Sequence, residues 1–201
     1  VMAITSEYTT SAVQSSLTVN PRRGMFYATK SVATALFALV AGIVGILLAA
    51  GVLWLFTRGH DITALTSDQS RIIPVTLIGF PLTIVLVSLM AQGLGGMTRS
   101  TVGGVCALIV LFMVLSSVLS ITSMAINQVE WLGTLSYLTP DTAMNHFLGA
   151  GIESSSQSTL AAAVKPNYWI PDWWQSGLIL LAWAAAAWAG GLIVTKKADI
   201  K

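Results

Sequence analysis

Hydroxyl side chains gather in one apolar stretch and are the first candidates for chemistry. Ser116, Ser120 and Ser123 recur at intervals of four and three residues, so a helix places them on one face. Such a face could line the path of a substrate. Alternatively, each hydroxyl bonds a backbone carbonyl one turn back or a neighbouring helix, which is the more common situation for a single residue.

Other patterns that could carry chemistry are incomplete. His60 and His146 are the only histidines, and neither has a second ligand at metal-site spacing. No nucleophile with a base and no carboxylate pair is recognisable. The stretch "GLGGMTRST" (residues 93–101) lacks the Gly-Lys-Ser/Thr ending of a phosphate-binding loop, and we expect a tight turn there. We therefore expect no catalytic residue, no metal and no cofactor in this chain.

Composition points to a membrane protein. Of the residues, 55% are hydrophobic and 9% charged, against roughly 25% charged in soluble domains. The net charge of +2 does not favour nucleic acid as a partner. Four apolar runs approach or exceed the length of about 20 residues that crosses a bilayer. We predict an all-α, polytopic single transmembrane domain over residues 1–201, with spans at Ser31–Phe56, Ile72–Met90, Thr101–Ile126 and Trp174–Thr195.

The positions of the charged residues predict how the chain is oriented in the membrane and which source of energy a transporter of this sequence could use. None of the four runs contains a charged residue, whereas ion-coupled carriers usually keep ionisable residues in their spans. Energy for any transport would therefore enter from elsewhere. The positive-inside rule places both ends of the chain in the cytoplasm. Seven basic residues are then inside (Arg22, Arg23, Lys30, Arg99, Lys196, Lys197 and Lys201) and three outside (Arg58, Arg71 and Lys165).

The outer segment between the last two spans, Asn127–Trp173, is expected to contain a short amphipathic helix. In "YLTPDTAMNHFLGAG", Thr139 suits the N-cap, Pro140 the first helical position and Gly149 the stop. The helix would lie in, or dip into, the outer leaflet. An aromatic belt at the outer interface is expected from Tyr168, Trp169, Trp173 and Trp174.

Small residues recur every fourth position on two spans, which favours close helix packing in lipid. They are Ala41, Gly45 and Ala49 on the first span, and Ala182, Ala186 and Gly190 on the last. We interpret them as bundle packing, with a dimer seam as the alternative. Pro81, in the middle of the second span, predicts a kink.

The N-terminal 30 residues are polar apart from "VMAI", which we expect to be the end of a preceding transmembrane helix. "EYTTSAVQSSLTV" can form a short cytoplasmic helix with Val13 and Leu17 on one face and Pro21 closing it. The alternative is a solvated loop whose Arg22, Arg23 and Lys30 contact anionic headgroups.

The order of these elements resembles the permease subunits of bacterial type-2 ATP-binding-cassette (ABC) exporters. The resemblance rests on Glu-Tyr followed by a short polar helix, "PRRGMFYATK" and a long span. It continues in "GLGGMTRSTVGG", in "YLTPDTAMNHF" and in a last span ending "TKKADIK". Each motif is loose, and their order over essentially the whole chain carries the resemblance.

The resemblance implies six spans per subunit, of which this chain holds the third to sixth, and a dimer with a second permease copy or homologue in the bacterial plasma membrane. It implies a coupling helix at residues 7–19 that docks on a separate cytoplasmic ATPase subunit, which binds ATP and Mg. The region 134–150 would be the re-entrant outer helices. The implied ATPase contacts are Glu7, Tyr8, Val13, Gln14, Leu17, Pro21, Arg22 and Arg23.

The function expected is therefore a non-catalytic permease that couples ATP hydrolysis in its partner to export of an amphipathic substrate. A structural or assembly subunit of a larger membrane complex is the alternative. An ion-coupled carrier is disfavoured by the charge-free spans.

Overall fold

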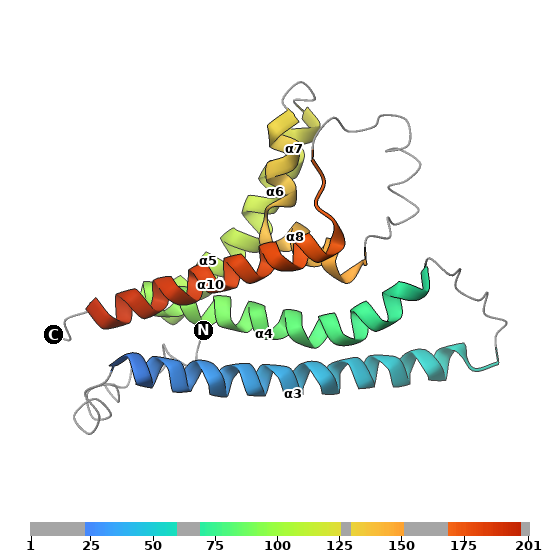
Figure 1. Cartoon of the computed structure of the whole chain (residues 1–201), viewed down its shortest axis with the longest axis horizontal. Coiled ribbons are helices and arrows are strands. Elements are labelled where there is room, and N and C mark those ends of the chain that lie inside the picture. The colour runs from blue at the N-terminus through green and yellow to red at the C-terminus, as the bar shows by residue number, and fades with distance from the viewer. Residues whose placement is uncertain (1–22, 60–68, 126–129, 151–168, 198–201) are drawn as a thin grey trace.

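Four helical spans make up most of the chain in a computed structural model, which describes residues 23–59, 69–125, 130–150 and 169–197. Each is long and apolar enough to cross a membrane, as the sequence predicted (Figure 1). The first span is α3 (Arg23–Thr57), and the second is α4 (Ile72–Thr98), which follows the 3-10 turn η1 (Gln69–Arg71). The third span consists of three consecutive helices: α5 (Thr101–Ile109), the π-helical η2 (Val110–Val114) and α6 (Leu115–Ala125). The fourth span is α10 (Trp173–Lys197).

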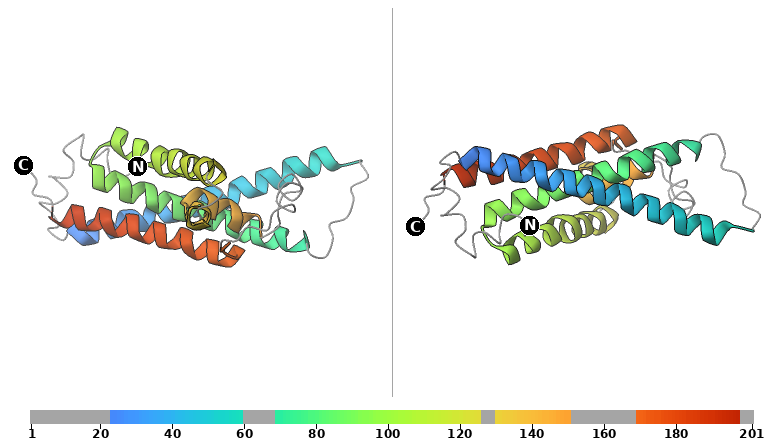
Figure 2. Two further views of the ribbon diagram at one scale, coloured as in Figure 1. Left: turned by 90° about the horizontal axis from the view of Figure 1, so that it is seen from above. Right: turned by 90° about the horizontal axis from the view of Figure 1, so that it is seen from below.

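Helix α4 lies in the middle of the bundle and packs against both α3 and α10. Helices α3 and α4 cross at an angle (Figure 2) and touch where Pro81 lies against Gly42. The third span starts beside α4 and then leaves the plane of the other three (Figure 1). Helix α4 therefore contacts each of the other three spans, the third of them through α5.

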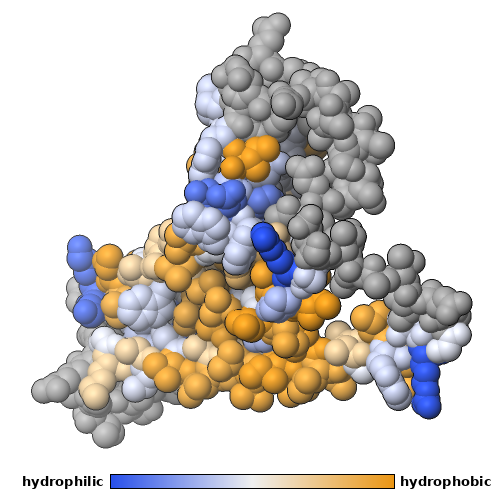
Figure 3. All heavy atoms as spheres, turned by 45° about the vertical axis from the view of Figure 1, so that its right-hand side comes forward, coloured by the Kyte–Doolittle hydropathy of each residue, from blue (hydrophilic) through white to orange (hydrophobic). Residues whose placement is uncertain are grey.

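The surface of the bundle is apolar. Large side chains such as Phe37, which is 78% exposed, project from α3 along its length, and hydrophobic residues cover the middle of the molecule in Figure 3. Lys30 and Arg58 stack on Phe26 and Trp54 near the two ends of this helix. Their separation of 58 − 30 = 28 residues corresponds to about 42 Å, close to the full thickness of a bilayer including its headgroups. An apolar surface of this extent matches contact with lipid.

The tight turn predicted over residues 93–101 is wrong in its extent. Helix α4 continues through the glycines to Thr98, and only two residues connect it to α5. Arg99 has a left-handed backbone (φ 51°) and donates its N–H to the Gly95 carbonyl at 2.9 Å. The Ser100 hydroxyl then accepts the Gly103 N–H at 3.3 Å and caps α5.

The glycines of α4 allow contact between helix backbones. A Cβ on Gly93 would overlap the backbone of Ala187 and Trp188 in α10, and a Cβ on Gly191 would approach the backbone of Gly93 to 2.8 Å. In lipid, this kind of small-residue contact joins helices without a hydrophobic driving force. The same face continues into the buried core of Met90, Leu180, Ala184 and Ala187.

The predicted small-residue stripes are not the packed faces of this bundle. Ala41, Ala49, Ala182 and Ala186 are exposed. Gly45 and Gly190 only approach the side chains of Phe80 and Met97. All sides of these spans are apolar, so a four-residue spacing does not reveal which side faces a neighbour. The dimer-seam alternative stays a prediction.

The short helix predicted between the last two spans is present at the predicted position. Helix α8 (Pro140–Leu148) follows Thr139 at its N-cap and ends at Gly149. Ala150, rather than Gly149, takes the left-handed backbone after the helix (φ 53°). An additional helix, α7 (Glu130–Tyr137), precedes it and packs against α6. Helix α8 packs on α10 and α4 and therefore contacts other helices of the bundle.

Candidate functional site

One candidate site is a polar cluster that joins three spans inside the bundle: Tyr27 and Ser31 of α3, Gln92 of α4 and Trp188 of α10. The Ser31 hydroxyl accepts hydrogen bonds from Gln92 Nε2 at 2.9 Å and from Trp188 Nε1 at 2.8 Å. It donates to the Tyr27 carbonyl oxygen at 2.8 Å. A single hydroxyl group therefore connects all three helices.

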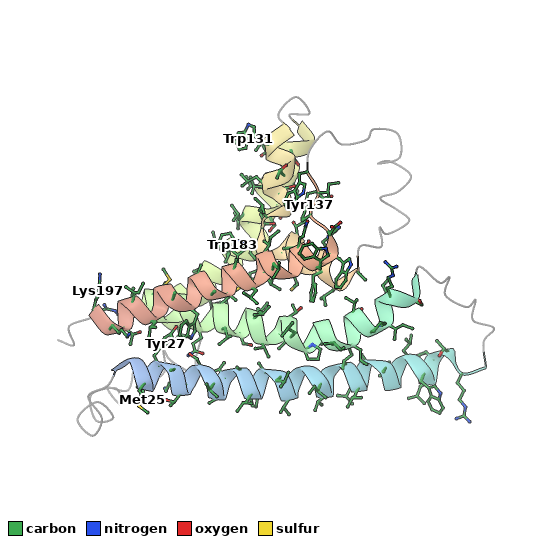
Figure 4. The ribbon with its side chains drawn as sticks, viewed as in Figure 1. Met25, Tyr27, Trp131, Tyr137, Trp183 and Lys197 are labelled. Atoms are coloured by element: carbon green, nitrogen blue, oxygen red, sulfur yellow. The ribbon has the colours of Figure 1, made fainter. Side chains whose placement is uncertain are left out.

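Tyr27 completes this cluster and lies between α3 and α10 in Figure 4. Its hydroxyl donates to the Trp188 carbonyl oxygen at 3.3 Å, and its ring lies 5.8 Å from the Trp188 ring. Tyr27 is 1% exposed and Gln92 is fully buried. Gln92 Oε1 is the one atom here without a hydrogen-bond partner among the described residues. The cluster fixes the three helices at the end of the bundle that holds Lys30 and Lys196.

A second candidate element is Phe147 of α8, which separates α4 from α10 at their other end. The Phe147 ring packs against a glycine on each helix. A Cβ added to Gly79 of α4 would be 2.9 Å from the ring, and a Cβ added to Gly177 of α10 would be 3.0 Å from it. The ring also stacks on Trp173, with centroids 6.4 Å apart. Helices α4 and α10 thus touch directly at Gly93 and Gly191 and are held apart by an aromatic ring at Gly79 and Gly177.

Hydrogen bonds hold α8 and the residues before it in this position. Thr76 of α4 donates to the Leu148 carbonyl oxygen at 3.3 Å. Trp183 of α10 donates its indole N–H to the Leu138 carbonyl oxygen at 2.8 Å (Figure 4). Each bond uses a side chain of a span and a backbone carbonyl of the inserted segment. The inserted segment is therefore attached to α4 and α10 independently.

His146 and Ser176 form a further contact between α8 and α10, with Nδ1 and Oγ 3.1 Å apart. Ser176 donates its single hydroxyl hydrogen to the Asp172 carbonyl oxygen at 3.1 Å. His146 Nδ1 must then carry a hydrogen and donate it to Ser176. Because Ser176 is fully buried and its hydrogen is directed at a backbone carbonyl, the pair is an anchor rather than a nucleophile with its base.

The predicted substrate-path serines have three different environments. Ser116 is 5% exposed, and its hydroxyl has no hydrogen-bond partner among the described residues. Ser120 is exposed, and Ser123 donates to the Ser120 carbonyl oxygen at 2.9 Å, which is the local bond considered as the alternative. Thr83 of α4, which the sequence did not single out, is 3% exposed and also lacks a partner. The buried, unpartnered hydroxyls of Ser116 and Thr83 are the better candidates for contact with a substrate.

The predicted ATPase-contact residues are almost all outside the described part of the chain. This holds for Glu7, Tyr8, Val13, Gln14, Leu17, Pro21 and Arg22, while Arg23 is the first residue of α3. Tyr168 of the expected aromatic belt is outside it as well, whereas Trp169 and Trp174 are exposed and Trp173 stacks on Phe147. Within the described ranges, no group of three His, Cys, Asp or Glu side chains could hold a metal ion.

Comparisons with models of protein families, with curated proteins and with solved structures found no match to this chain.

Proposed function

We propose that this chain is the permease subunit of an ATP-driven ABC exporter, in which a partner ATPase drives export of an amphipathic substrate. The observation that carries the proposal is the paired arrangement of α4 and α10. They touch at Gly93 and Gly191 and are separated by Phe147 at Gly79 and Gly177. We infer that displacement of the Phe147 ring would allow the two helices to approach at this end, which would give the pair a second arrangement.

The source of energy follows from the charges of the spans. Helices α4, α5 and α6 contain no charged residue, and the basic residues of α3 and α10 lie near the helix ends. Coupling to a proton or ion normally uses ionisable groups within the membrane. The charge-free spans are consistent with the proposal that energy is delivered by a partner outside the bundle.

Residues 7–19 are the proposed coupling helix, on the basis of the resemblance in the sequence. Force applied there would be transmitted through Arg23 into α3 and, at the polar cluster, from Ser31 to Gln92 of α4 and Trp188 of α10. The polar cluster would thus link the ATPase to the two helices that Phe147 separates. The function in the membrane would be that of a transmitter and conduit.

The coupling proposal is tested in the complex with its ATPase by the variants Glu7→Ala, Leu17→Ala and Arg22→Ala, with Ser15→Ala as the control. A transmitter loses substrate-stimulated ATPase activity while the complex still assembles. Unchanged activity and unchanged assembly in all three variants would reject the assignment of the coupling helix.

A further inference from the structure

A groove runs between α3 and α10 next to the polar cluster, with Ser31 and Trp188 in its lining. Its volume is about 420 Å³, within the range of roughly 300–1,000 Å³ typical of sites for small molecules. Helix α4 forms its floor through Leu86 and Leu89. The walls are Ala28, Val32 and Ala35 of α3, and Leu181, Ala185 and Trp188 of α10.

The lining of this groove is chemically uniform. Alanine, valine and leucine side chains make up most of it, and its polar atoms belong to Ser31 and Trp188. The Ser31 hydroxyl and the Trp188 indole N–H are already bonded to each other. A ligand in this groove therefore meets a hydrocarbon surface without a free polar partner, and an alkyl chain suits that surface.

A basic residue, Lys196, follows the groove-lining side of α10 toward the C-terminal end of that helix. On α10, Ala185 and Trp188 are followed at helical spacing by Leu192 and Lys196, which continue the same side of the helix toward its C-terminus. The Lys196 side chain lies against Gly24 of α3: a Cβ added to Gly24 would be 2.9 Å from Lys196 Cε. Lys196 is exposed and lies about two helical turns beyond Trp188, the last lining residue of α10.

We propose that this groove binds an anionic phospholipid, with one acyl chain between α3 and α10 and the phosphate on the Lys196 ammonium group. The apolar lining accommodates the chain, and Lys196, beyond Trp188 on α10, provides the complementary charge. The inference does not depend on the exporter proposal, because a bound lipid would stabilise the α3–α10 contact in a scaffold as well.

Binding of phosphatidylglycerol to the purified full-length protein, titrated by native mass spectrometry in detergent, tests this site with two matched pairs of variants. Lys196→Gln is compared with Lys197→Gln, because Lys197 points away from α3 (Figure 4). Ala35→Trp fills the groove and is compared with Ala33→Trp, because Ala33 is exposed and does not line it.

We expect Lys196→Gln to weaken binding about fivefold, the effect of one basic side chain at an anionic membrane surface. Ala35→Trp should abolish the tightest bound lipid, and both controls should bind as the wild type does. Equal weakening by Lys196→Gln and Lys197→Gln, or unchanged binding by Ala35→Trp, would overturn the proposal.

A second copy of the chain is the competing occupant of the groove. Ala35→Cys in a Cys106→Ser background distinguishes the two, because Cys106 is the only native cysteine. A lipid-filled groove leaves the cysteines of two copies apart, and oxidation yields no cross-linked pair. Efficient disulfide formation between copies in the membrane would show that protein, rather than lipid, covers the groove and would overturn the proposal.

Discussion

The indole Nε1 of Trp188 donates a hydrogen bond of 2.8 Å to the hydroxyl of Ser31, joining residues 157 positions apart in the sequence. Gln92 donates to the same oxygen from the helix between them. The Ser31 hydroxyl is the acceptor of both bonds, so this one group on α3 connects α3 to α4 and to α10.

Replacing Ser31 by alanine removes the acceptor of one buried donor, Gln92, and one partly buried donor, Trp188. We expect Ser31→Ala to lower the free energy of unfolding in detergent by about 1 kcal/mol, the upper range measured for hydrogen bonds between membrane helices. Ser88→Ala is the control, because Ser88 donates only to the Ile84 carbonyl of its own helix. An equal effect of both substitutions would contradict the role of Ser31 as a link between spans.

Gly93 is the position of α4 with the least room for a side chain. A Cβ there would overlap the backbone of α10, and a backbone cannot move as the end of a side chain can. Gly93→Ala should therefore cost about 2 kcal/mol or more, within the range for overpacked cores, and should lower the melting temperature. Gly51→Ala, with open space around its Cβ position, should leave melting unchanged or raise it slightly. Similar melting temperatures for the two variants would contradict the close helix contact.

Phe147 separates α4 from α10, so its truncation should loosen α8. The ring is partly buried, and we expect Phe147→Ala to cost about 2 kcal/mol, less than the roughly 3–5 kcal/mol for a fully buried Phe. Transport by the complex should fall as well, because the two arrangements of α4 and α10 would no longer be distinguished. Phe37→Ala, at an exposed position of α3, is the control for both assays. Full transport activity in Phe147→Ala would exclude a functional role for the ring.

The buried hydroxyls of Thr83 and Ser116 have no hydrogen-bond partner among the described residues. An unpaired buried polar group is destabilising, so Thr83→Val and Ser116→Ala should each raise the free energy of unfolding by up to about 1 kcal/mol. If these hydroxyls contact the substrate, the same variants lower transport, while Ser123→Ala, with its local hydrogen bond, does not. Destabilisation by both substitutions would mean that the hydroxyls have partners in the membrane-embedded protein.

The parts of the fold that depend on local signals were predictable. Hydrophobic length located the four spans, and Thr139 and Pro140 located the start of α8. Helix rotation was not predictable, because spans that are apolar on every side carry no amphipathic signal. The glycines of residues 93–96 predict a turn, whereas they lie in helix α4. Glycine is typical both of turns and of close helix contacts in lipid, so its presence alone does not distinguish the two.

The polar cluster was not predictable, because it joins residues that are neighbours only after the helices have packed. A signal was nevertheless present. Gln92 is the one amide side chain within the second apolar region that the structure extends to Thr98, and an amide in lipid requires a partner. Ser31 and Trp188 provide the hydroxyl and the indole that such a partner network uses.

The measurement that tests the central claim most directly is the identification of proteins that remain bound when the full-length protein is purified from its native membrane in mild detergent. Mass spectrometry should find a subunit in near-stoichiometric amount that carries a phosphate-binding loop and an ABC signature sequence. Recovery of the chain without such an ATPase, or within a stable complex of another kind, would contradict the exporter proposal and favour the scaffold function.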